Sequence, residues 1–398
     1  MPARRHAELP RWIGGLVLLL LWAHDAEAHT KGLTLSRFGL IDVSLQGNVD
    51  YTIFSDPNKV DFDKIGDRSK QGFNLTSFDL SLTGETPEFP MKFAMFITFE
   101  QDSASIEEAF VFFHKLGEFT PVLSDFQATV GQFRAKFGQF NQIHDHEWFL
   151  EDPPLINTKF LGVDGVHLLG AEVTYQVPIP QFLQLALSVQ SKGTEDGFPA
   201  ATSSTPPTFA LQKTQDIVGF ARAETFFDLT DNSDLSLGVS GAMGKNKPNS
   251  NDLTYLIGGD VMLRWKSGAQ SWPYIRWLTE GIWAIRDNPI VVAGARKGQQ
   301  VDSDVVGGFF SEIGYRFARH WQLTGRVDYV GIPKGNEDEH LRLTGGLRFL
   351  ITSVAKLGIQ YDYSFPSGRD PGYSAVIFQL NVGLGTVTPG VGKFLDPM

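Results

Sequence analysis

The 398-residue sequence contains no cysteine, which excludes disulfide-stabilised folds, thiol catalysis and metal sites built on thiolates. Beyond residue 28 there is no run of apolar residues long enough for a membrane-spanning helix. Basic side chains are outnumbered: 34 Lys and Arg against 45 Asp and Glu give a net charge of −11, which argues against a nucleic-acid partner. Any bound metal would depend on histidine and carboxylate ligands.

Residues 1–28 have the three parts of a secretory signal peptide. Three arginines accompany an uninterrupted apolar run over residues 12–23, and Ala-Glu-Ala at 26–28 is a small-x-small cleavage site. The apolar run is too short to cross a bilayer, so we favour a signal peptide over a helical anchor. The mature chain is then expected to begin at His29, with residues 29–398 forming one exported domain in a bacterial envelope.

From residue 36 onward, apolar and polar side chains alternate with a period of two, in segments of about ten residues. A soluble β-sandwich also alternates, but here short turns alternate with longer polar loops. Eight long loops and seven short turns separate 16 strands, an even number that puts both termini on the short-turn side. The pattern therefore predicts an all-β fold, a 16-stranded antiparallel transmembrane β-barrel in the outer membrane, surrounded by lipid.

Aromatic residues gather where these strands should meet the membrane interfaces, which is typical of such barrels. Trp265 and Trp272 flank one short turn, and Tyr361, Tyr363 and Tyr373 lie near the last long loop. The predicted strands, in chain order, are 36–50, 73–84, 90–100, 107–115, 125–136, 165–177, 181–190, 214–227, 234–243, 252–265, 272–286, 304–317, 320–330, 340–349, 353–363 and 373–384.

A barrel of about 16 strands is too wide for side chains to fill, so we expect an aqueous channel with a polar inward face. The alternation predicts that this face is rich in basic side chains: Arg264, Arg276, Arg316, Arg326, Arg342, Arg348 and Lys356, with Arg134, Lys136 and Arg222 elsewhere. Two interpretations remain open. The basic residues either set the selectivity of a pore or pair with inward acids and simply solvate the lumen; these acids are Asp260, Glu280, Glu312, Asp328 and Asp362.

The loop over residues 138–164 has large apolar side chains, and its first part carries the four acids Asp145, Glu147, Glu151 and Asp152. Apolar groups need a surface to pack on, so we expect this loop to fold into the lumen as a constriction loop. Its acids would then face the arginine wall and create a transverse field that selects solutes by size and charge. The alternatives are a lid over the outer rim or a contact with another subunit.

His144 and His146 could share a face of an extended segment and bind zinc, with Glu151 or Asp152 completing the site. The alternative, which we favour, is that both are polar loop residues beside acids, because no third histidine is close in the sequence. We therefore expect no cofactor, with zinc as the open alternative. The sequence has no G-x-S-x-G, P-loop or dinucleotide-binding motif, so an enzyme is not expected.

Residues 131–138, Gly-Gln-Phe-Arg-Ala-Lys-Phe-Gly, resemble the segment with which phosphate-selective porins enter their constriction loop. The chain thus resembles the porin family that includes them. The resemblance implies a 16-stranded barrel, commonly a homotrimer, that admits small hydrophilic solutes passively. The acidic, histidine-containing continuation at 142–152 departs from a phosphate-attracting loop and is more similar to outer-membrane proteins associated with zinc. The tail at 393–398 also departs from the family, whose members often end on an aromatic strand residue.

The leading expectation is a passive outer-membrane channel for small hydrophilic solutes. The second is a zinc-associated receptor or channel that uses His144 and His146. The third is an outer-membrane enzyme, which would need a compact catalytic triad and a smaller, filled barrel. A receptor with 22 strands and an internal plug is excluded by the length of the chain.

Overall fold

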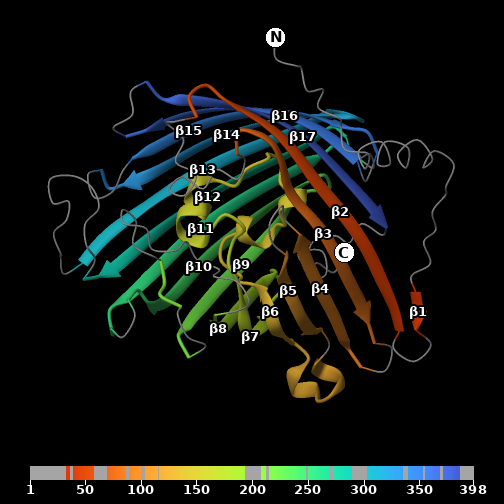
Figure 1. The fold of residues 1–398 in the computed structure, drawn as a ribbon. Coiled ribbons are helices and arrows are strands. Elements are labelled where there is room, and N and C mark those ends of the chain that lie inside the picture. Colours follow the sequence, from red (N-terminus) through yellow and green to blue (C-terminus); the bar gives the residue numbers. More distant parts are fainter. Residues whose placement is uncertain are drawn as a thin grey trace, which may run out of the picture.

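In the computed structural model, one antiparallel sheet curves round and closes on itself into a barrel with strongly tilted strands (Figure 1). The structure describes residues 33–35, 39–57, 70–86, 89–99, 104–114, 116–192, 208–211, 215–247, 250–268, 272–288, 303–334, 339–352, 355–367 and 371–385. The expected signal peptide at 1–28 and the tail at 393–398 lie outside the described residues.

The barrel strands are β2 (Gly39–Phe54), β3 (Gly72–Glu85), β4 (Met91–Phe99), β5 (Ala104–Phe113), β6 (Phe126–Arg134), β7 (His167–Gln176), β8 (Leu183–Ser191), β9 (Ile217–Thr230), β10 (Ser233–Lys245), β11 (Leu253–Lys266), β12 (Tyr274–Asp287), β13 (Ser303–Ala318), β14 (Trp321–Ile332), β15 (His340–Leu350), β16 (Ala355–Pro366) and β17 (Tyr373–Gly385). A short strand, β1 (Leu33–Leu35), pairs with the start of β2. The described helices are η1 (Leu116–Glu118), η2 (Pro121–Leu123), η3 (Phe140–Gln142), η4 (Asp145–Glu147) and α3 (Leu155–Leu161). Among the described residues, no helix has both the length and the apolar character needed to cross a membrane.

Each barrel strand pairs with its neighbours in the chain, and two pairings show that the ring is complete. β17 pairs with β2 from Ala375↔Phe54 to Gly385↔Ser44, and β9 pairs with β10 along most of its length. The predicted 16-stranded antiparallel barrel is confirmed, and each predicted strand corresponds to one observed strand with ends that agree within about four residues. β1 was not predicted.

The two faces of the barrel differ as the alternation predicts. On β10, Val239 is 63% exposed whereas Ser240 is 2% exposed, and on β14 Leu323 is 53% exposed whereas Thr324 is 3% exposed. In both pairs the exposed side chain is apolar and the buried side chain is polar. Because lipid cannot hydrogen-bond to a strand edge, a closed sheet with this outer face suits a hydrocarbon environment.

The aromatic pattern is only partly as expected. Trp265 and Tyr361 are 38% and 49% exposed and belong to the outward face. Tyr373 is instead 2% exposed, because it pairs with inward-facing Ser364 and therefore points into the barrel, where it packs with Phe54. The predicted position of Tyr373 beside the last long loop is correct, but its side chain lies on the inward face and not at the membrane interface.

An arginine introduced on the outward face should destabilise the barrel far more than one in a turn. Val239→Arg places the charge near the middle of β10 and should lower the free energy of unfolding by about 2–4 kcal/mol. The control, Val122→Arg, alters a residue of η2 that is 81% exposed, and should cost about 1 kcal/mol or less. Denaturant unfolding in lipid bilayers measures both. Equal losses would contradict the assignment of the outward face to lipid.

Candidate functional site: a segment docked on the inner wall

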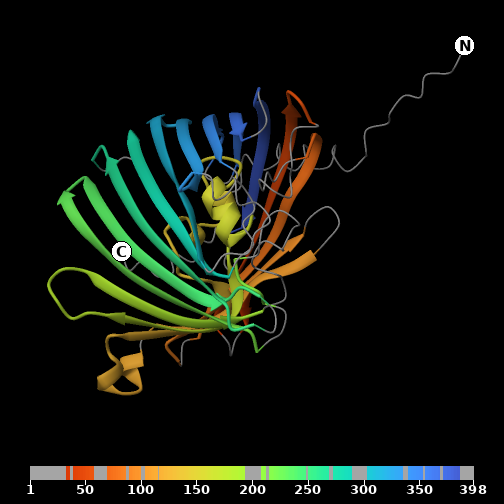
Figure 2. The same ribbon diagram turned by 90° about the vertical axis from the view of Figure 1, so that its left-hand side faces the viewer.

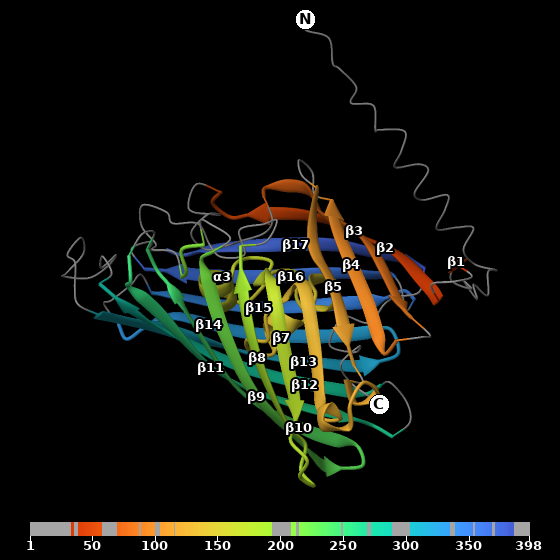
Figure 3. The same ribbon diagram turned by 90° about the horizontal axis from the view of Figure 1, so that it is seen from below.

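Residues 138–164, which we call the docked segment, connect β6 to β7 and contain η3, η4 and α3. Figure 2 shows the segment in yellow, lying within the curve of the strands, and Figure 3 shows the same arrangement from below. Its base is held together by Asn141, whose Nδ2 donates to the Ala135 carbonyl and whose Oδ1 accepts from the Val166 amide, both at 2.8 Å. The chain therefore leaves the wall and rejoins it at the same place.

The apolar side chains of the docked segment pack against an apolar part of the inner wall. The Phe140 ring lies 5.1 Å from the Trp148 ring and 5.6 Å from the ring of Phe310 on β13, measured between centroids. Burying each such side chain contributes about 1.5–3 kcal/mol. The cluster combines Phe140, Trp148, Leu155, Ile156, Phe160 and Leu161 with wall residues that include Val218, Phe220, Leu256, Leu278, Ile282 and Phe310.

This apolar wall was missed by the sequence analysis, which assigned the inward face to polar groups. A signal was present, because β11 and β12 carry large apolar residues on both faces. On β11 outward Tyr255 and Ile257 flank Leu256, which is 1% exposed. A strand that is apolar on both faces must have a dry neighbour on both. Here the outward face is exposed, and the docked segment covers the inward one.

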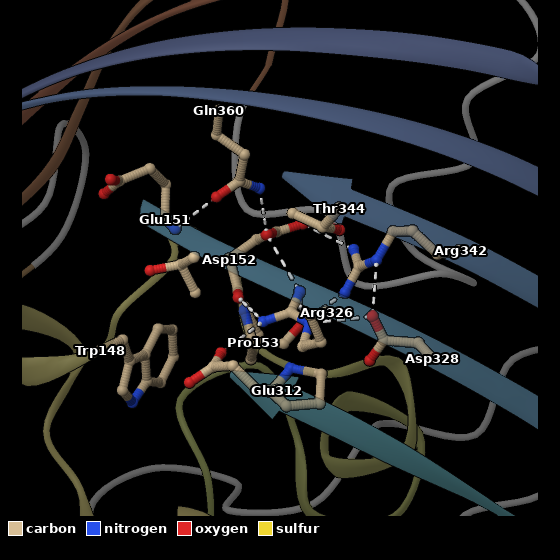
Figure 4. Close-up of polar contacts among 12 residues, drawn as sticks. Trp148, Glu151, Asp152, Pro153, Glu312, Arg326, Asp328, Arg342, Thr344 and Gln360 are labelled. Carbon is tan, nitrogen blue, oxygen red and sulfur yellow. Dashed lines mark hydrogen bonds and ion pairs between the residues drawn. The ribbon is translucent and has the colours of Figure 1, made fainter. Parts of the chain in front are cut away.

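Asp152 is held between two arginines of the wall (Figure 4). Arg342 Nη1 lies 2.6 Å from Asp152 Oδ2, and Arg326 Nη2 lies 3.2 Å from Asp152 Oδ1. Asp328, between the two arginines on the wall, pairs with Arg326 Nε at 2.9 Å and accepts from the Leu155 amide at 3.0 Å. All these groups are buried, so their charges are compensated directly and only weakly screened by water.

The two arginines also set the protonation of Asp152. Burial alone would raise the pKa of this carboxyl group, but the positive charges of Arg342 and Arg326, with hydrogen bonds from Gln360 and Arg326, hold its pKa below the ordinary value of 3.8. Asp152 is therefore ionised at neutral pH, and the pair contributes to docking as an ion pair.

Glu151 and Trp148 extend the same contact to β15 and β16. Arg348 Nη2 lies 3.0 Å from Glu151 Oε1, and Arg348 also donates to the Trp148 carbonyl. Gln360 accepts from the Glu151 amide at 2.7 Å and donates to Asp152. Predicted residues Arg326, Arg342, Arg348, Glu151 and Asp152 are thus brought together, in direct contact rather than across an open gap.

On the opposite side, Glu280 of β12 binds the first turn of the docked segment. Its Oε2 accepts from the backbone amides of Gln139 and Phe140 at 2.8 and 3.0 Å, and its Oε1 accepts from Asn157 Nδ2 at 2.9 Å. Gly138 has φ +67°, and a Cβ there would lie 2.4 Å from Glu280 Oε1. Only glycine therefore fits the approach of the backbone to this carboxylate.

Arg134 and Lys136, at the start of the segment, are paired with wall glutamates. Arg134 contacts Glu107 and lies 3.3 Å from Glu108 Oε1, measured from its Nε, and Lys136 Nζ lies 3.0 Å from Glu172 Oε1. The sequence analysis did not single out these glutamates. The basic entrance of the segment is consequently neutralised by its own wall.

His144 joins this group of charges. Its Nε2 lies 3.0 Å from Glu108 Oε1, and its ring packs 4.9 Å from the Phe96 ring. Burial lowers the pKa of His144 well below its ordinary value, and the nearby positive charge of Arg134 lowers it further. His144 is therefore neutral at pH 7.

Three predicted arginines occupy positions outside the Asp152 network. Arg276 packs over the Phe149 ring at 3.4 Å from its centroid and pairs with Glu312 at 2.8 Å. Arg264 pairs with Asp234 near the short-turn end of β11, and Arg316 donates to the Arg319 carbonyl at the end of β13. Arg264 and Arg316 thus find these partners near the short-turn ends of their strands, because the alternation of faces along a strand gives the face of a residue but not its height along the barrel.

The acids at the start of η4 take a different position from Glu151 and Asp152. Asp145 and Glu147 lie near the amine of Lys356, which donates to the His146 carbonyl. Asp145 also lies beside β3, with Asp79 and His146. The hypothesis that all four loop acids face arginines is therefore corrected: two bind arginines directly, and two lie by a lysine.

The hypothesised zinc ligands do not gather around one point, although the rings of His144 and His146 stack at 5.5 Å between centroids. Glu151 and Asp152 cannot complete a site with His144 and His146, because both carboxylates are bound to arginines. His144 is bound to Glu108, whereas His146 belongs to a different group with Asp79 and Asp145.

The wall acids support the second interpretation of the basic residues. Arg222 pairs with Asp260 at 2.6 Å, and Arg326 lies 3.7 Å from Glu312 as well as beside Asp328. Asp362 instead accepts hydrogen bonds from Thr344 and Gln360. The charges of the inner wall are thus largely compensated locally.

No family model matches the chain. In sequence it is 25% identical to an uncharacterized protein of Aquifex aeolicus (strain VF5) over 346 residues, which cover 80% of this chain and 70% of that protein.

Several solved outer-membrane proteins are similar to it in structure. An anion-selective porin from Comamonas acidovorans superposes with a TM-score of 0.54 at 8% identity, over 86% of this chain and 99% of that one. The outer-membrane channel DcaP of Acinetobacter baumannii gives 0.54 at 12% identity, over 89% and 99%. The trimer form of OmpT, an outer-membrane protein of Vibrio cholerae, gives 0.53 at 9% identity, over 87% and 100%. At these identities the common property is the barrel fold.

Removing the charge of Asp152 should release the docked segment and destabilise the protein. Asp152→Asn removes one of the two carboxylates that Arg326 and Arg342 share and leaves both to Asp328, so the free energy of unfolding should fall by about 3–5 kcal/mol. Glu85→Gln is the control, since Glu85 is 55% exposed and its pairs with Lys92 and His114 are worth about 1 kcal/mol or less. Denaturant unfolding measures both. Similar losses in the two variants would contradict a docking role for Asp152.

Docking should weaken only in acid. Because the pKa of Asp152 is lower in the folded protein than its ordinary value of 3.8, its stabilisation is fully present above pH 3.8 and is lost as the pH falls below that value. Limited proteolysis of residues 138–164 between pH 7 and pH 3 should therefore show protection that ends only below about pH 4. In Asp152→Asn that pH dependence should shrink, and an unchanged pH profile in the variant would contradict it.

Proposed function

We propose that the protein is a porin-type channel of the bacterial outer membrane, through which small hydrophilic solutes diffuse passively. The observation that carries the proposal is the closed barrel with a lipid-compatible outer face and a polar inner face. A barrel of this strand number is wider than its own side chains can fill. Among the described residues, the segment 138–164 enters that width, and Phe209, in residues 208–211, belongs to the same inner apolar cluster.

The inner wall of β2, β3 and β17 carries neutral polar side chains, of which Asn48, Ser77 and Asn381 are 3%, 1% and 4% exposed. Gln46 donates to Asn381, Asn381 donates to Asn48, and Asn48 donates to Ser77 at 2.8 Å. These neutral amides and hydroxyls form a connected polar strip on the inner face. Neutral hydrogen-bonding groups of this kind replace the water around a polar solute without demanding a particular charge.

The docked segment is inferred to narrow this passage. Its apolar core covers β9–β14, Glu151 and Asp152 reach β14–β16, and Asp145 reaches Ser77 of β3, so that the segment would cross the lumen and narrow the passage. Because Arg134, Lys136 and the Asp152 arginines are paired with acids, we infer a pore that discriminates mainly by size. Selectivity for phosphate, which the segment at 131–138 suggested, would require free positive charge and is not part of the proposal.

Location, assembly and chemistry follow the same proposal. The apolar outer face implies lipid around the barrel, and the trimer form of a structural neighbour makes a homotrimer the assembly to test first. We propose that the protein acts as a passage and not as a catalyst, and that its partners are lipid, small solutes and copies of itself.

Removing the docked segment should enlarge the channel. Because the Ala135 amide donates to the Val166 carbonyl at 2.9 Å, replacing residues 137–164 with Asn-Gly would close β6 and β7 as a two-residue hairpin. Single-channel conductance in planar bilayers should rise several-fold over that of the full chain. The control is Glu85→Gln, which lies outside the segment and should leave the conductance unchanged.

Both channels must be shown to be folded, by the circular dichroism of the strands. A folded full chain that gives no conductance steps would contradict the channel. Equal conductance with and without the segment would contradict its role as a constriction while leaving the channel intact.

A further inference from the structure

One group of potential metal ligands joins the docked segment to the wall at a point away from the arginines. It consists of Asp79 on β3 with Asp145 and His146 of η4, whose ligand atoms all lie within 4.8 Å of one another. The three side chains come from two parts of the chain that are distant in sequence. They are brought together only because the segment is docked.

The surroundings orient these groups toward one another. Ser77 Oγ lies 3.0 Å from Asp79 Oδ2 and 3.4 Å from Asp145 Oδ2, so the hydroxyl lies between the two carboxylates and donates its proton to one of them. His146 Nδ1 lies 3.6 Å from Asp145 Oδ1, and the His146 amide donates to the same oxygen at 2.6 Å. The backbone of η4 thus fixes the histidine beside the acid.

The three side chains of this group differ from the nearby salt bridges in their exposure to solvent. Asp79 is 8% exposed, whereas the side chains of Asp145 and His146 are 19% and 12% exposed. The group therefore combines a buried ligand with two that an ion in solution can reach. Glu151 and Asp152 of the segment are instead bound to arginines and offer no such access.

We propose that Asp79, Asp145 and His146 bind a divalent transition-metal ion of the zinc class, which ties the docked segment to β3. Two carboxylate oxygens and one imidazole nitrogen are a donor set that zinc accepts, with water in the fourth position. Ligand atoms around zinc lie about 3.4 Å apart at bonds of about 2.1 Å, so small side-chain rotations bring these three into range. The ion would also offset the mutual repulsion of the two carboxylates.

The site differs from the one that the sequence suggested. His144 is bound to Glu108 and neutral, although its ring stacks on that of His146 at 5.5 Å between centroids. The donor set therefore contains one histidine and not two. It also does not depend on whether the barrel conducts solutes, because it needs only the docked segment and β3.

The affinity test uses the full chain in detergent micelles, freed of metal with a chelator and titrated with Zn²⁺ alone by calorimetry. The native protein should bind one equivalent saturably. His146→Gln and Asp79→Asn should each weaken binding at least tenfold. His114→Gln is the matched control, since His114 also faces a carboxylate, Glu85, at 3.4 Å but lies outside the group; its affinity should equal that of the native protein.

A spectroscopic measurement keeps the test decisive if Asp79→Asn fails to fold. Cu²⁺ bound to the native protein should show coupling to one nitrogen in its electron paramagnetic resonance spectrum, and His146→Gln, which alters a residue of the segment and not of the barrel, should abolish it. The proposal is overturned by a lack of saturable Zn²⁺ binding, by binding that survives both substitutions, or by a two-nitrogen spectrum. Any of these results would leave the conductance test of the channel unaffected.

Discussion

Backbone hydrogen bonding in a solvent without water is the constraint on which this structure depends. A strand edge exposed to hydrocarbon leaves amide and carbonyl groups without partners, at a cost of several kcal/mol each. The pairing of β17 with β2 removes that edge and fixes the circumference of the ring. The circumference then fixes the width of the interior. Everything inside the barrel, including its need for an inserted segment, follows from this closure.

The inner wall has an apolar part and a charged part, and the docked segment matches each of them with side chains of the same or the opposite kind. Where the wall is apolar, as at Leu256 and Phe310, the docked segment covers it with its own apolar side chains. Where the wall is charged, as at Arg326 and Arg342, the segment supplies a carboxylate. A buried charge without a partner costs far more than the pair gains, so these contacts specify one docked position more than they add stability.

Much of the fold was predictable because lipid and the barrel interior impose a period of two along each strand. Arg326 was placed on the correct face in this way, and the apolar residues of the 138–164 loop correctly indicated that it needs a surface. The alternation of faces could not predict that Arg326 contacts the docked segment while Arg264 pairs near a short turn, since both face inward but at different heights along the barrel axis. It also could not identify Glu108 as the partner of both Arg134 and His144, because such contacts depend on the curvature of the closed sheet.

The partners of the docked segment lie far downstream in the chain, and this orders the assembly of the protein. Asp152 meets Arg326 across 174 residues, and Glu151 meets Arg348 across 197. These contacts therefore cannot form until β14 and β15 are in place in the sheet. A chain truncated before β14 would lack Arg326, Arg342 and Arg348. Glu151 and Asp152 of the segment would then have none of these arginines to bind.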